Sequence, residues 1–453
     1  MYTFQDFEEA PDKTQFVLSA IEAYKRDDMF LTAKEADEYD AQRNTTISQV
    51  VPKLFNLAGV QVEDITASNN RIASNFFHRL VTQRCTFSLG SGVSFIDPYE
   101  ATKGETDETK EKLGKHFDYT IYEAGYNAIK HGVSYLFWDV DRVYEFSATE
   151  LVPLVDEYDG SLRAAIRFWQ LSNAKPLNAV LYEQDGFTSY RTQNGKFGEI
   201  EPKRAYKLTY DYTEADGTVD IKEENYTLLP IVRVYGNSLK QSALVGMKAA
   251  IDAYDLVKSG FANDLADVAQ IYWIVENYGG MDDEDLRQFL NRLKFNHIAN
   301  ADTQSGGKVT PYTQEIPYAA RQALLTELRN GIYEDFGGLD VHTVSAGATN
   351  DHIDAAYQPM EENAADFEHW VSDAIIQLLE LQGIDDTPQF RHIRVSNQKE
   401  QVEMLVQEAA WLDNKTILRK LPNLTADEAN AVILNTETED MDRFGFNGGD
   451  ENA

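Results

Sequence analysis

Residues 241–270 read QSALVGMKAAIDAYDLVKSGFANDLADVAQ, and the rest of the chain is organised around this stretch. Its apolar side chains recur every three or four residues, which predicts one apolar stripe along a helix. The stripe comprises Leu244, Met247, Ile251, Tyr254, Val257, Phe261, Leu265 and Val268. At 1.5 Å per residue the helix would be about 45 Å long, which exceeds the usual globular helix of about three to four turns. We expect either a strut packed beside copies of itself or the core helix of a large domain.

The opposite face of the same helix is charged. It carries Lys248, Asp252, Asp255, Lys258, Asp264 and Asp267. Because charged side chains are rarely buried without partners, this face is expected to lie in water or against polar partners.

Length and composition indicate a large soluble protein. The chain has 453 residues, 43% of them hydrophobic, which is enough for two to four domains with a sizeable core. Membrane spans are not expected, because no apolar run approaches the roughly 20 residues they need, and residues 1–20 lack the regions of a signal peptide. A single cysteine, Cys85, excludes an intrachain disulfide and a cysteine-rich zinc site. We therefore expect cytosolic folding.

The net charge of −34 is large for this length. An acidic surface repels nucleic acid, so sequence-independent DNA binding through a basic patch is not expected. A surface that DNA must pass without sticking is a different case, in which net negative charge is useful.

Helical patterns dominate the first part of the chain and strand patterns the next. Residues 1–40 look helical and acidic, and residues 69–87 predict an amphipathic helix with arginines, Arg84 among them, on its polar face. Another helix is predicted over about residues 113–131. In residues 133–229, alternating apolar and polar positions separated by Asp-Gly and Asn-Gly turns predict about seven antiparallel strands.

Beyond the long helix the pattern is mixed and then helical again. Residues 271–315 read as a strand, a Gly-Gly turn, a short helix and one or two short strands. A second long helix starts near Pro317 and stops at Gly337, and after a loop a third spans residues 360–383. A strand and a helical tail follow, and residues 436–453 are acidic and expected to be disordered. The predicted fold class is α+β.

Several phrases, in this order along the chain, resemble the portal proteins of tailed bacteriophages, of the siphophage type. They are RIASNFFHRLVTQRCTFSLGSGVSF, YEAGYNAIKHGVSYLFWDVD, FSATELVPLVDEYDGSLRAAIRFW, PIVRVYGNSLKQSALVGMKAAIDAYDLVKSGFANDLADV, FRHIRVSNQKE and WLDNKTILRKLPNLTADEA. The fourth phrase resembles the family's entry into a stem helix. The chain departs from the family at Gly236-Asn237, where two asparagines are usual, and past Asn435, where no counterpart is recognised.

The resemblance implies a structural function without a cofactor, a metal or enzymatic activity. Such a protein forms a dodecameric ring at one capsid vertex, with an axial channel for packaging and ejecting double-stranded DNA. Its expected partners are copies of itself, the DNA, the terminase large subunit, a head–tail adaptor, and the major capsid and scaffolding proteins, with no membrane. It is expected in the virion, and in the host cytoplasm during assembly.

The resemblance also divides the chain into regions of a portal fold: long stem helices, a mixed α/β clip insertion, an antiparallel-β and helical wing, and a helical crown. The regions are a wing (1–236), a stem helix (237–268), a clip (269–315), a second stem helix (316–340), a tunnel loop (341–358), a long wing helix and strand (359–396), a crown (397–435) and the acidic tail (436–453).

In this interpretation the tunnel loop lines the narrowest part of the channel. Its residues are Ser345, Ala346, Gly347, Ala348, Thr349 and Asn350. They are small and uncharged, which suits a sleeve that touches DNA phosphates loosely. An ordinary flexible surface connection is the alternative.

The resemblance implies three further groups of functional residues. Candidates for phosphate contact, which are equally interpretable as solvated charges, are Lys308, Arg321 and Arg329. Stem packing would use Leu244, Met247, Ile251, Tyr254, Phe261 and Leu265. Aromatic residues of the clip, either a docking surface or the clip's own core, are Trp273, Tyr278, Phe289 and Phe295. Which face of the stem helix meets DNA stays open, and its acidic face is a candidate channel wall.

Enzymatic alternatives rest on weaker patterns. Residues 306–308, Gly-Gly-Lys, lack the spacing of an ATPase loop. Asp351 and His352 with Asp354 form an acid/base pattern, but a Gly/Ala-rich loop holds such a group poorly.

A cation could bind Asp139 and Asp141, although carboxylates two apart on a strand more often share a solvent face. The alternative function is therefore a metal-dependent hydrolase or nuclease using carboxylates of the β region. A third possible function, besides the portal and the hydrolase, is that of an extended scaffold or adhesin subunit without a channel.

Overall fold

The computed structural model describes residues 2–50, 54–57, 60–63, 68–96, 107–213, 218–268, 272–276, 308–312, 317–340 and 350–392, with isolated positions between 284 and 433. Helices and antiparallel sheets are mixed along these residues, in agreement with the α+β prediction. The chain divides into two compact units. The first comprises residues 1–42, 75–248 and 332–453, and the second residues 43–74 and 249–331.

Three capped helices open the first unit. They are α1 (Phe4–Glu9), α2 (Lys13–Tyr24) and α3 (Asp28–Asp40). The side chains of Thr3, Asp12 and Asp27 accept hydrogen bonds from amides of the first turns, which a helix start otherwise leaves unpaired. Apolar residues of α1 and α2 pack on a five-stranded sheet, so this part of the unit has its own core.

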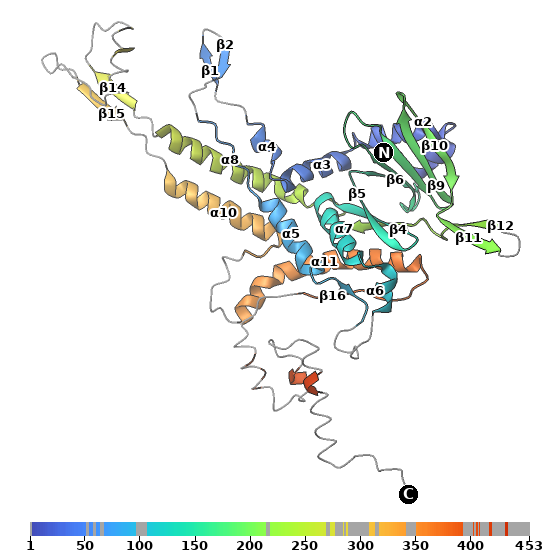
Figure 1. The fold of residues 1–453 in the computed structure, drawn as a ribbon. Coiled ribbons are helices and arrows are strands. Elements are labelled where there is room, and N and C mark those ends of the chain that lie inside the picture. Colours follow the sequence, from blue (N-terminus) through green and yellow to red (C-terminus); the bar gives the residue numbers. More distant parts are fainter. Residues whose placement is uncertain are drawn as a thin grey trace. The chain divides into compact units, whose positions relative to one another are not determined.

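The sheets of the first unit are antiparallel (Figure 1). The five-stranded sheet has the order β10-β9-β8-β7-β6, a three-stranded sheet has the order β13-β4-β5, and β11 pairs with β12. The strands are β4 (Val133–Asp139), β5 (Arg142–Ser147), β6 (Leu151–Val155), β7 (Leu162–Trp169), β8 (Asn178–Glu183), β9 (Gly186–Gln193), β10 (Lys196–Arg204), β11 (Lys207–Thr213), β12 (Thr218–Glu224) and β13 (Ile231–Tyr235).

Nine strands lie between β4 and β12, whereas the sequence predicts about seven. The charged run EIEPKR within β10 lacks the alternation of a half-buried strand, so sequence patterns miss it. β10 is an edge strand, and edges tolerate both charge and a proline such as Pro202.

Helices cover the three-stranded sheet. α7 packs against β4 and β5, α3 and α5 pack against α7, and α11 packs against β13 and α5 (Figure 1). These helices and the neighbouring short elements are α5 (Phe76–Leu89), α6 (Glu108–Leu113), α7 (Phe117–His131), α11 (Asn350–Glu380), β3 (Val93–Ser94) and its antiparallel partner β16 (Gln389–Phe390).

The helix predicted over residues 69–87 differs from α5 in two respects. It begins only at Phe76, because residues 68–75 are not helical and bind another helix, as described below. Arg84 is buried rather than solvated: its guanidinium donates to the carbonyl of Asn363 and lies over the ring of Phe367. Burial lowers the pKa of Arg84 to about 10. A backbone carbonyl and a ring from α11 supply the partners that the sequence pattern of α5 cannot show.

The second unit contains most of two long helices. α8 (Leu244–Val268) and α10 (Tyr318–Phe336) each have one end in the first unit. The remaining elements are α4 (Thr45–Ser48), the hairpin β1 (Leu54–Leu57) with β2 (Val60–Glu63), and the antiparallel pair β14 (Tyr272–Glu276) with β15 (Lys308–Tyr312). The predicted order of a long helix, strands and a returning helix is confirmed for the described residues.

The third long helix starts earlier than predicted. α11 begins at Asn350 and contains Pro359, so residues 350–358 of the expected tunnel loop are helical. The sequence interpretation leaves Pro359 at the end of the loop and starts the helix at Met360. In the structure Ile353, Tyr357 and Met360 are buried in one apolar cluster on both sides of the proline. That burial outweighs the backbone hydrogen bond that proline removes.

A half-buried carboxyl lies between α7 and the three-stranded sheet. Glu145 accepts hydrogen bonds from Ser134 (2.6 Å) and Asn127 (3.0 Å), and desolvation raises its pKa to about 7. The ordinary pKa of a glutamate is 4.5. Between pH 4.5 and about pH 7, therefore, Glu145 is protonated in the folded protein and ionised in the unfolded chain. Stability from this group is therefore full below about pH 4.5 and falls as pH rises through about 7.

Replacing Glu145 by glutamine is expected to remove this pH dependence. The amide keeps an acceptor for Ser134 and Asn127, and avoids a cost of up to about 3 kcal/mol for a buried charge at pH 8. Melting temperatures at pH 5 and pH 8 check this: Glu145→Gln should be more stable than the parent only at pH 8. Glu22→Gln, at an exposed position of α2, should follow the parent at both. A Glu145→Gln profile parallel to the parent's would refute the assignment.

Candidate functional site

The predicted packing stripe of α8 is covered by this chain only in part. Its first members are buried: Leu244, Met247 and Ile251. Tyr254 and Phe261 are half-buried, and Leu265 is 53% exposed. The first half of the stripe is therefore core, whereas its far end is open to another surface.

α8 and α10 contact each other within the second unit. The rings of Phe261 and Tyr318 lie 5.7 Å apart between centres. Arg321 forms an ion pair with Asp264 and lies 5.7 Å above the Phe261 ring. Because residues late in α8 contact the start of α10, the two helices run antiparallel.

The three candidates for phosphate contact differ in their surroundings. Arg321 is paired with Asp264, so a phosphate would have to replace that carboxylate. Arg329 lies near the phenol of Tyr254. Burial raises the pKa of this phenol, and the positive charge of Arg329 lowers it by a smaller amount. Lys308 begins β15, and its side chain lies outside the described residues.

The polar face of α8 is bound by residues 68–75, a segment that is neither helix nor strand and that we call the strap. Every second amide of the strap donates to a side chain one turn further along the helix. Ser74 N donates to Asp255 Oδ1 (2.9 Å), Ile72 N to Ser259 Oγ (2.9 Å), and Asn70 N to Asn263 Oδ1 (2.6 Å). Two residues of an extended chain advance about 6.6 Å, and one helical turn advances about 5.4 Å. These two repeats are similar enough for three successive amides to meet three successive turns of α8.

The residues before the strap complete the contact. Asn44 Nδ2 donates to Asp255 Oδ2 (2.5 Å), and Thr46 Oγ1 donates to Asp252 Oδ2 (2.7 Å). Asp255 is 0% exposed, and burial raises its pKa. For Asp252 and Asp255, therefore, the charged face of α8 meets polar partners rather than water.

Sequence reasoning missed the strap. The signal available was that Ser259 and Asn263, which are polar but uncharged, continue the spacing of Asp252 and Asp255 along one face of α8. Serine and asparagine are unfavourable in helix interiors, so two of them on one face, in line with the aspartates, are a signal for hydrogen-bonding partners.

The start of α8 is joined to the end of α7 in the first unit. Ser242 Oγ accepts from Leu244 N (3.1 Å) and donates to the carbonyl of Lys130 (2.5 Å), so one hydroxyl caps both helices. Asn237, in the phrase that resembles the family's stem entry, closes the preceding loop by pairing with the backbone of Gln241 at both its amide and its carbonyl. Gly236 is required there, because a Cβ would collide with the carbonyl of Ala128.

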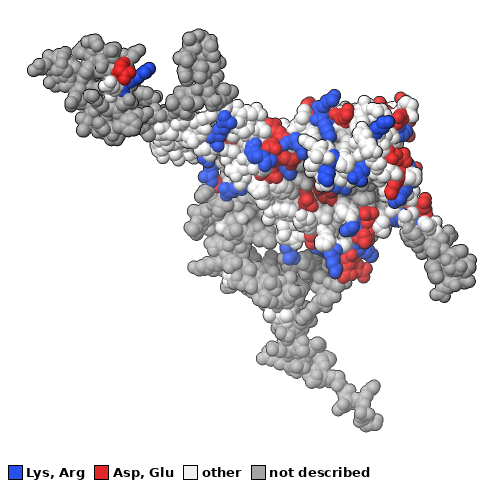
Figure 2. All heavy atoms as spheres, turned by 45° about the horizontal axis from the view of Figure 1, so that its top comes forward, with Lys and Arg blue, Asp and Glu red and all other residues white. Residues whose placement is uncertain are grey.

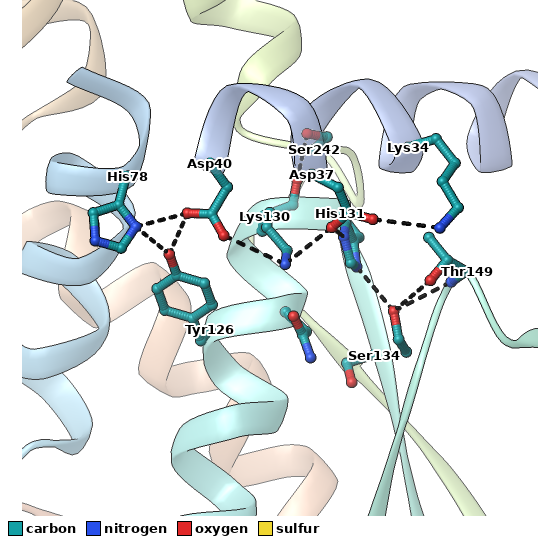
Figure 3. Close-up of polar contacts among 12 residues, drawn as sticks. Lys34, Asp37, Asp40, His78, Tyr126, Lys130, His131, Ser134, Thr149 and Ser242 are labelled. Atoms are coloured by element: carbon teal, nitrogen blue, oxygen red, sulfur yellow. Dashed lines mark hydrogen bonds and ion pairs between the residues drawn. The ribbon is translucent and has the colours of Figure 1, made fainter. Parts of the chain in front are cut away.

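A charged network surrounds this junction (Figure 3). Lys130 Nζ lies 3.0 Å from Asp37 and 3.6 Å from Asp40, and His131 Nε2 lies 2.8 Å from Asp37. Burial alone would raise the pKa of Asp37, but its hydrogen bonds and attraction to His131 and Lys130 outweigh burial and lower it. Burial lowers the pKa of His131 by more than its hydrogen bond to Asp37 raises it.

The network reaches α5 and α8. Asp40 also binds Tyr126 Oη and His78 Nδ1, the latter at 2.9 Å. Lys248, in the first turns of α8, lies 3.6 Å from Glu35 and 5.7 Å from the centre of the Tyr39 ring. Side chains of α3 therefore hold the ends of α7 and α8 together.

Other predicted groups are described only in part. Residues 345–349 of the tunnel loop lie outside the described residues, and Asn350 is the first residue of α11. Trp273 lies in β14 opposite Pro311, and Tyr278, Phe289 and Phe295 lie outside the described residues. The crown, residues 397–435, is described at isolated positions only, and the tail is outside.

The enzymatic patterns are not assembled into a site in the described part of the chain. Asp351, His352 and Asp354 are exposed on α11 and not on a loop. Asp139 and Asp141 flank the tight turn from β4 to β5, and burial raises the pKa of Asp139. Across the described residues, no group of three or more His, Cys, Asp or Glu side chains is placed to hold a metal ion. Nor does any described helix combine the length and apolarity of a membrane span.

Comparison with known proteins decides the family. A family model described as "Phage portal protein, SPP1 Gp6-like" matches residues 32–443. The chain belongs to this family of phage portal proteins. The predicted resemblance is therefore confirmed. As a member of the portal family the protein is a structural component of the phage particle, at a capsid vertex, and not an enzyme.

Curated relatives bear the same description. The portal protein of Clostridium phage phiCD119 is 24% identical over 433 residues, which cover 87% of this chain and 93% of the relative. That of Bacillus phage SPP1 is 23% identical over 326 residues, 68% of this chain and 61% of the relative. A solved structure described as the neck of an empty GTA particle is similar to this chain with a TM-score of 0.43 and 12% sequence identity. The match covers 76% of this chain and 88% of the chain in that structure.

Proposed function

We propose that this portal protein forms a dodecameric ring through which double-stranded DNA is packaged and ejected. The observation that carries the proposal is the family match over residues 32–443. In this ring α8 and α10 are the stem, the segment between them is the clip that meets the terminase motor and later the head–tail adaptor, and residues 341–349 are the tunnel loop. Residues 1–236 and α11 belong to the wing, which meets capsid and scaffolding proteins.

Exposed apolar side chains on the helix pair support packing between copies. Leu256 and Leu265 on α8, and Tyr318 and Leu324 on α10, are each more than 40% exposed in the single chain. Apolar side chains gathered in this way on two helices of one unit favour contact with another protein surface. In a ring that surface is the neighbouring stem.

The charge of the chain is unevenly divided. The second unit carries 10 basic and 14 acidic residues, whereas the first carries 31 and 61. Acidic and basic side chains are interspersed on the face drawn in Figure 2, without a broad basic stripe there. A second unit with little net charge binds phosphates weakly, and an acidic remainder keeps DNA from adhering elsewhere.

The strap favours α10 over α8 as the channel wall. Asp252 and Asp255, part of the acidic face that the sequence offers as a wall, are occupied by Thr46, Asn44 and the strap. Most residues of α10 between 318 and 331 are exposed. Arg321 and Arg329 then lie on the helix nearer to DNA, and Arg321 is held by Asp264 rather than presented as a free charge.

Imaging of the purified full-length chain tests the ring. Electron microscopy and native mass spectrometry should show closed rings of about twelve subunits with an open axis. A monomer that cleaves DNA in the presence of magnesium, or a ring with a closed axis, would refute the proposal.

Deleting residues 345–350 is expected to leave rings intact but to lower the yield of DNA-filled heads at least tenfold. The segment removes no described core residue, so assembly should be unaffected, whereas the narrowest part of the channel is lost. DNA protected from nuclease in assembled heads is the measurement. Deletion of residues 172–174, in an exposed turn between β7 and β8, is the matched control. Normal packaging by the first variant would show that the tunnel-loop assignment is wrong.

A further inference from the structure

β13 forms one edge of the three-stranded sheet, next to β4. Trp138 N donates to the carbonyl of Pro230 (2.9 Å), which fixes where the ladder between the two strands has its hydrogen bonds. In an antiparallel pair the backbone groups of successive residues point to opposite sides of a strand. Every second residue from Pro230 therefore bonds to β4, and the amides and carbonyls of Ile231, Arg233 and Tyr235 point away from it. Among the described residues, no hydrogen bond reaches these groups.

This edge lacks the features that usually protect an exposed strand from pairing with another chain. Such features are charged side chains, proline, bulges and a covering segment. β10, an edge of the five-stranded sheet, contains Pro202 and two register shifts. β13 contains no proline and pairs with β4 without a register shift, and its one charged side chain, Arg233, donates to the carbonyl of Gly160 (3.0 Å). The edge is therefore available for pairing unless another segment covers it.

A cavity of about 420 Å³ lies where a covering segment would be. Three successive residues of β13 line it: Ile231, Val232 and Arg233. Because successive side chains of a strand point to opposite faces of the sheet, a cavity that touches all three lies at the edge and not over one face. Its other walls include Leu162 at the start of β7 and Glu380 at the end of α11, all within the first unit. The volume is typical of a ligand pocket.

The charge around the cavity favours a cationic occupant. Glu380 is exposed, and no described lysine or arginine forms an ion pair with it. Arg163, which also lines the cavity, lies near two carboxylates, those of Asp156 (3.3 Å) and Asp159 (3.7 Å). Together with Arg233, these side chains sum to one net negative charge. Opposite charge on a partner speeds its encounter with such a surface, and like charge excludes it.

We propose that this cavity is a docking site where an extended, basic segment of a partner protein adds a strand to the free edge of β13. Main-chain hydrogen bonds to Ile231, Arg233 and Tyr235 supply the affinity, as in other complexes formed by strand addition. A cationic side chain of the segment lies against Glu380, which selects basic over acidic partners. That the partner is a protein of the phage head rests on the proposed function, whereas the free edge and the cavity do not.

A synthetic peptide tests the site on the purified full-length chain. The probe is acetyl-KVRVKV-amide, which alternates basic with β-branched residues and so favours an extended conformation. At saturation it should slow hydrogen exchange of the β13 amides that point away from β4 at least tenfold. Two control peptides should bind at least tenfold more weakly by calorimetry: acetyl-EVEVEV-amide, and KVRVKV with two adjacent N-methyl groups. The second control keeps the charge but loses a donor on each of its edges.

Two substitutions at one residue separate the backbone from the side chain. Arg233→Pro removes an amide that points away from β4 and leaves the ladder with β4 intact, so KVRVKV should bind at least tenfold more weakly. Arg233→Gln keeps the amide and removes the guanidinium, so its affinity for the peptide should stay within about twofold of the parent.

Glu380→Lys tests the charge without altering β13. A lysine at the end of α11 suits the negative pole of the helix, so the fold should be retained. KVRVKV should then bind at least tenfold more weakly, and EVEVEV should bind more tightly than it does to the parent.

Binding of the N-methylated peptide with the affinity of KVRVKV would overturn strand addition, and equal affinities for KVRVKV and EVEVEV would overturn the basic partner. Binding to isolated subunits but not to assembled rings would also overturn the proposal, because the edge would then be a contact between copies of this chain. Binding to a chain that forms no rings would support the docking site and count against the proposed ring alone.

Discussion

Aspartate in place of Ile251 is expected to unfold the helix pair α8–α10 and to abolish ring formation. Ile251 is 0% exposed, so the substitution removes a core side chain and buries a carboxylate without a cationic partner. The combined cost is more than about 4 kcal/mol, which exceeds what most single substitutions cause. Hydrogen exchange of α8 amides and size-exclusion chromatography of the purified variant measure the two effects.

Leu256→Asp separates folding from assembly. Leu256 lies on the same helix but is 42% exposed, so its replacement should leave amide protection in α8 within about twofold of the parent. Loss of rings by this variant alone would place Leu256 in the proposed contact between copies. Protection of α8 in Ile251→Asp equal to that in Leu256→Asp would show that Ile251 is not a core residue.

Methionine in place of Lys130 is expected to destabilise the first unit by about 3 kcal/mol. The alkyl chain is preserved, but Asp37 and Asp40 lose the ammonium between them, at a site where the lysine side chain is 12% exposed. Removing one partner from a buried ion pair costs about 3–5 kcal/mol, because the remaining charge stays desolvated. Urea denaturation followed by hydrogen exchange of α3 and α7 is the measurement.

Two further variants make that experiment specific. Lys34 also lies near Asp37, at 3.7 Å, but its side chain is 54% exposed, so Lys34→Met should cost less than about 0.5 kcal/mol. Adding Asp40→Asn to Lys130→Met should restore part of the loss, since it removes one of the two carboxylates that have lost the ammonium. Equal effects of Lys34→Met and Lys130→Met would contradict the proposed role of burial.

Local rules predicted much of the architecture. The three-to-four residue spacing from Leu244 onward predicted α8, and Pro317 and Gly337 predicted the bounds of α10, which ends at Phe336 with Gly337 at the left-handed φ of 67°. Asn194-Gly195 predicted the tight turn between β9 and β10, although not β10 itself, and both residues have positive φ. Such features depend on neighbours a few residues apart, so a sequence pattern contains them.

Partners of buried charges could not be predicted in this way. Arg84 and Asp255 were both assigned to polar faces because each lies opposite an apolar stripe. In the structure Arg84 binds a carbonyl 279 residues away, and Asp255 binds groups 181 and 211 residues away. Nothing within one helical turn of either residue identifies those partners.

The sequence by itself therefore determined the α+β class, the long helix pair, the hairpin turns and the portal family. Only the tertiary structure decided how much of the stretch over residues 241–270 is available to other molecules. Its acidic face, the candidate channel wall, is bound by the strap at Asp255, and its apolar stripe is exposed at Leu265. The physical reason is that helical periodicity records which side chains share a face, whereas the partner of a face depends on segments that the fold brings together.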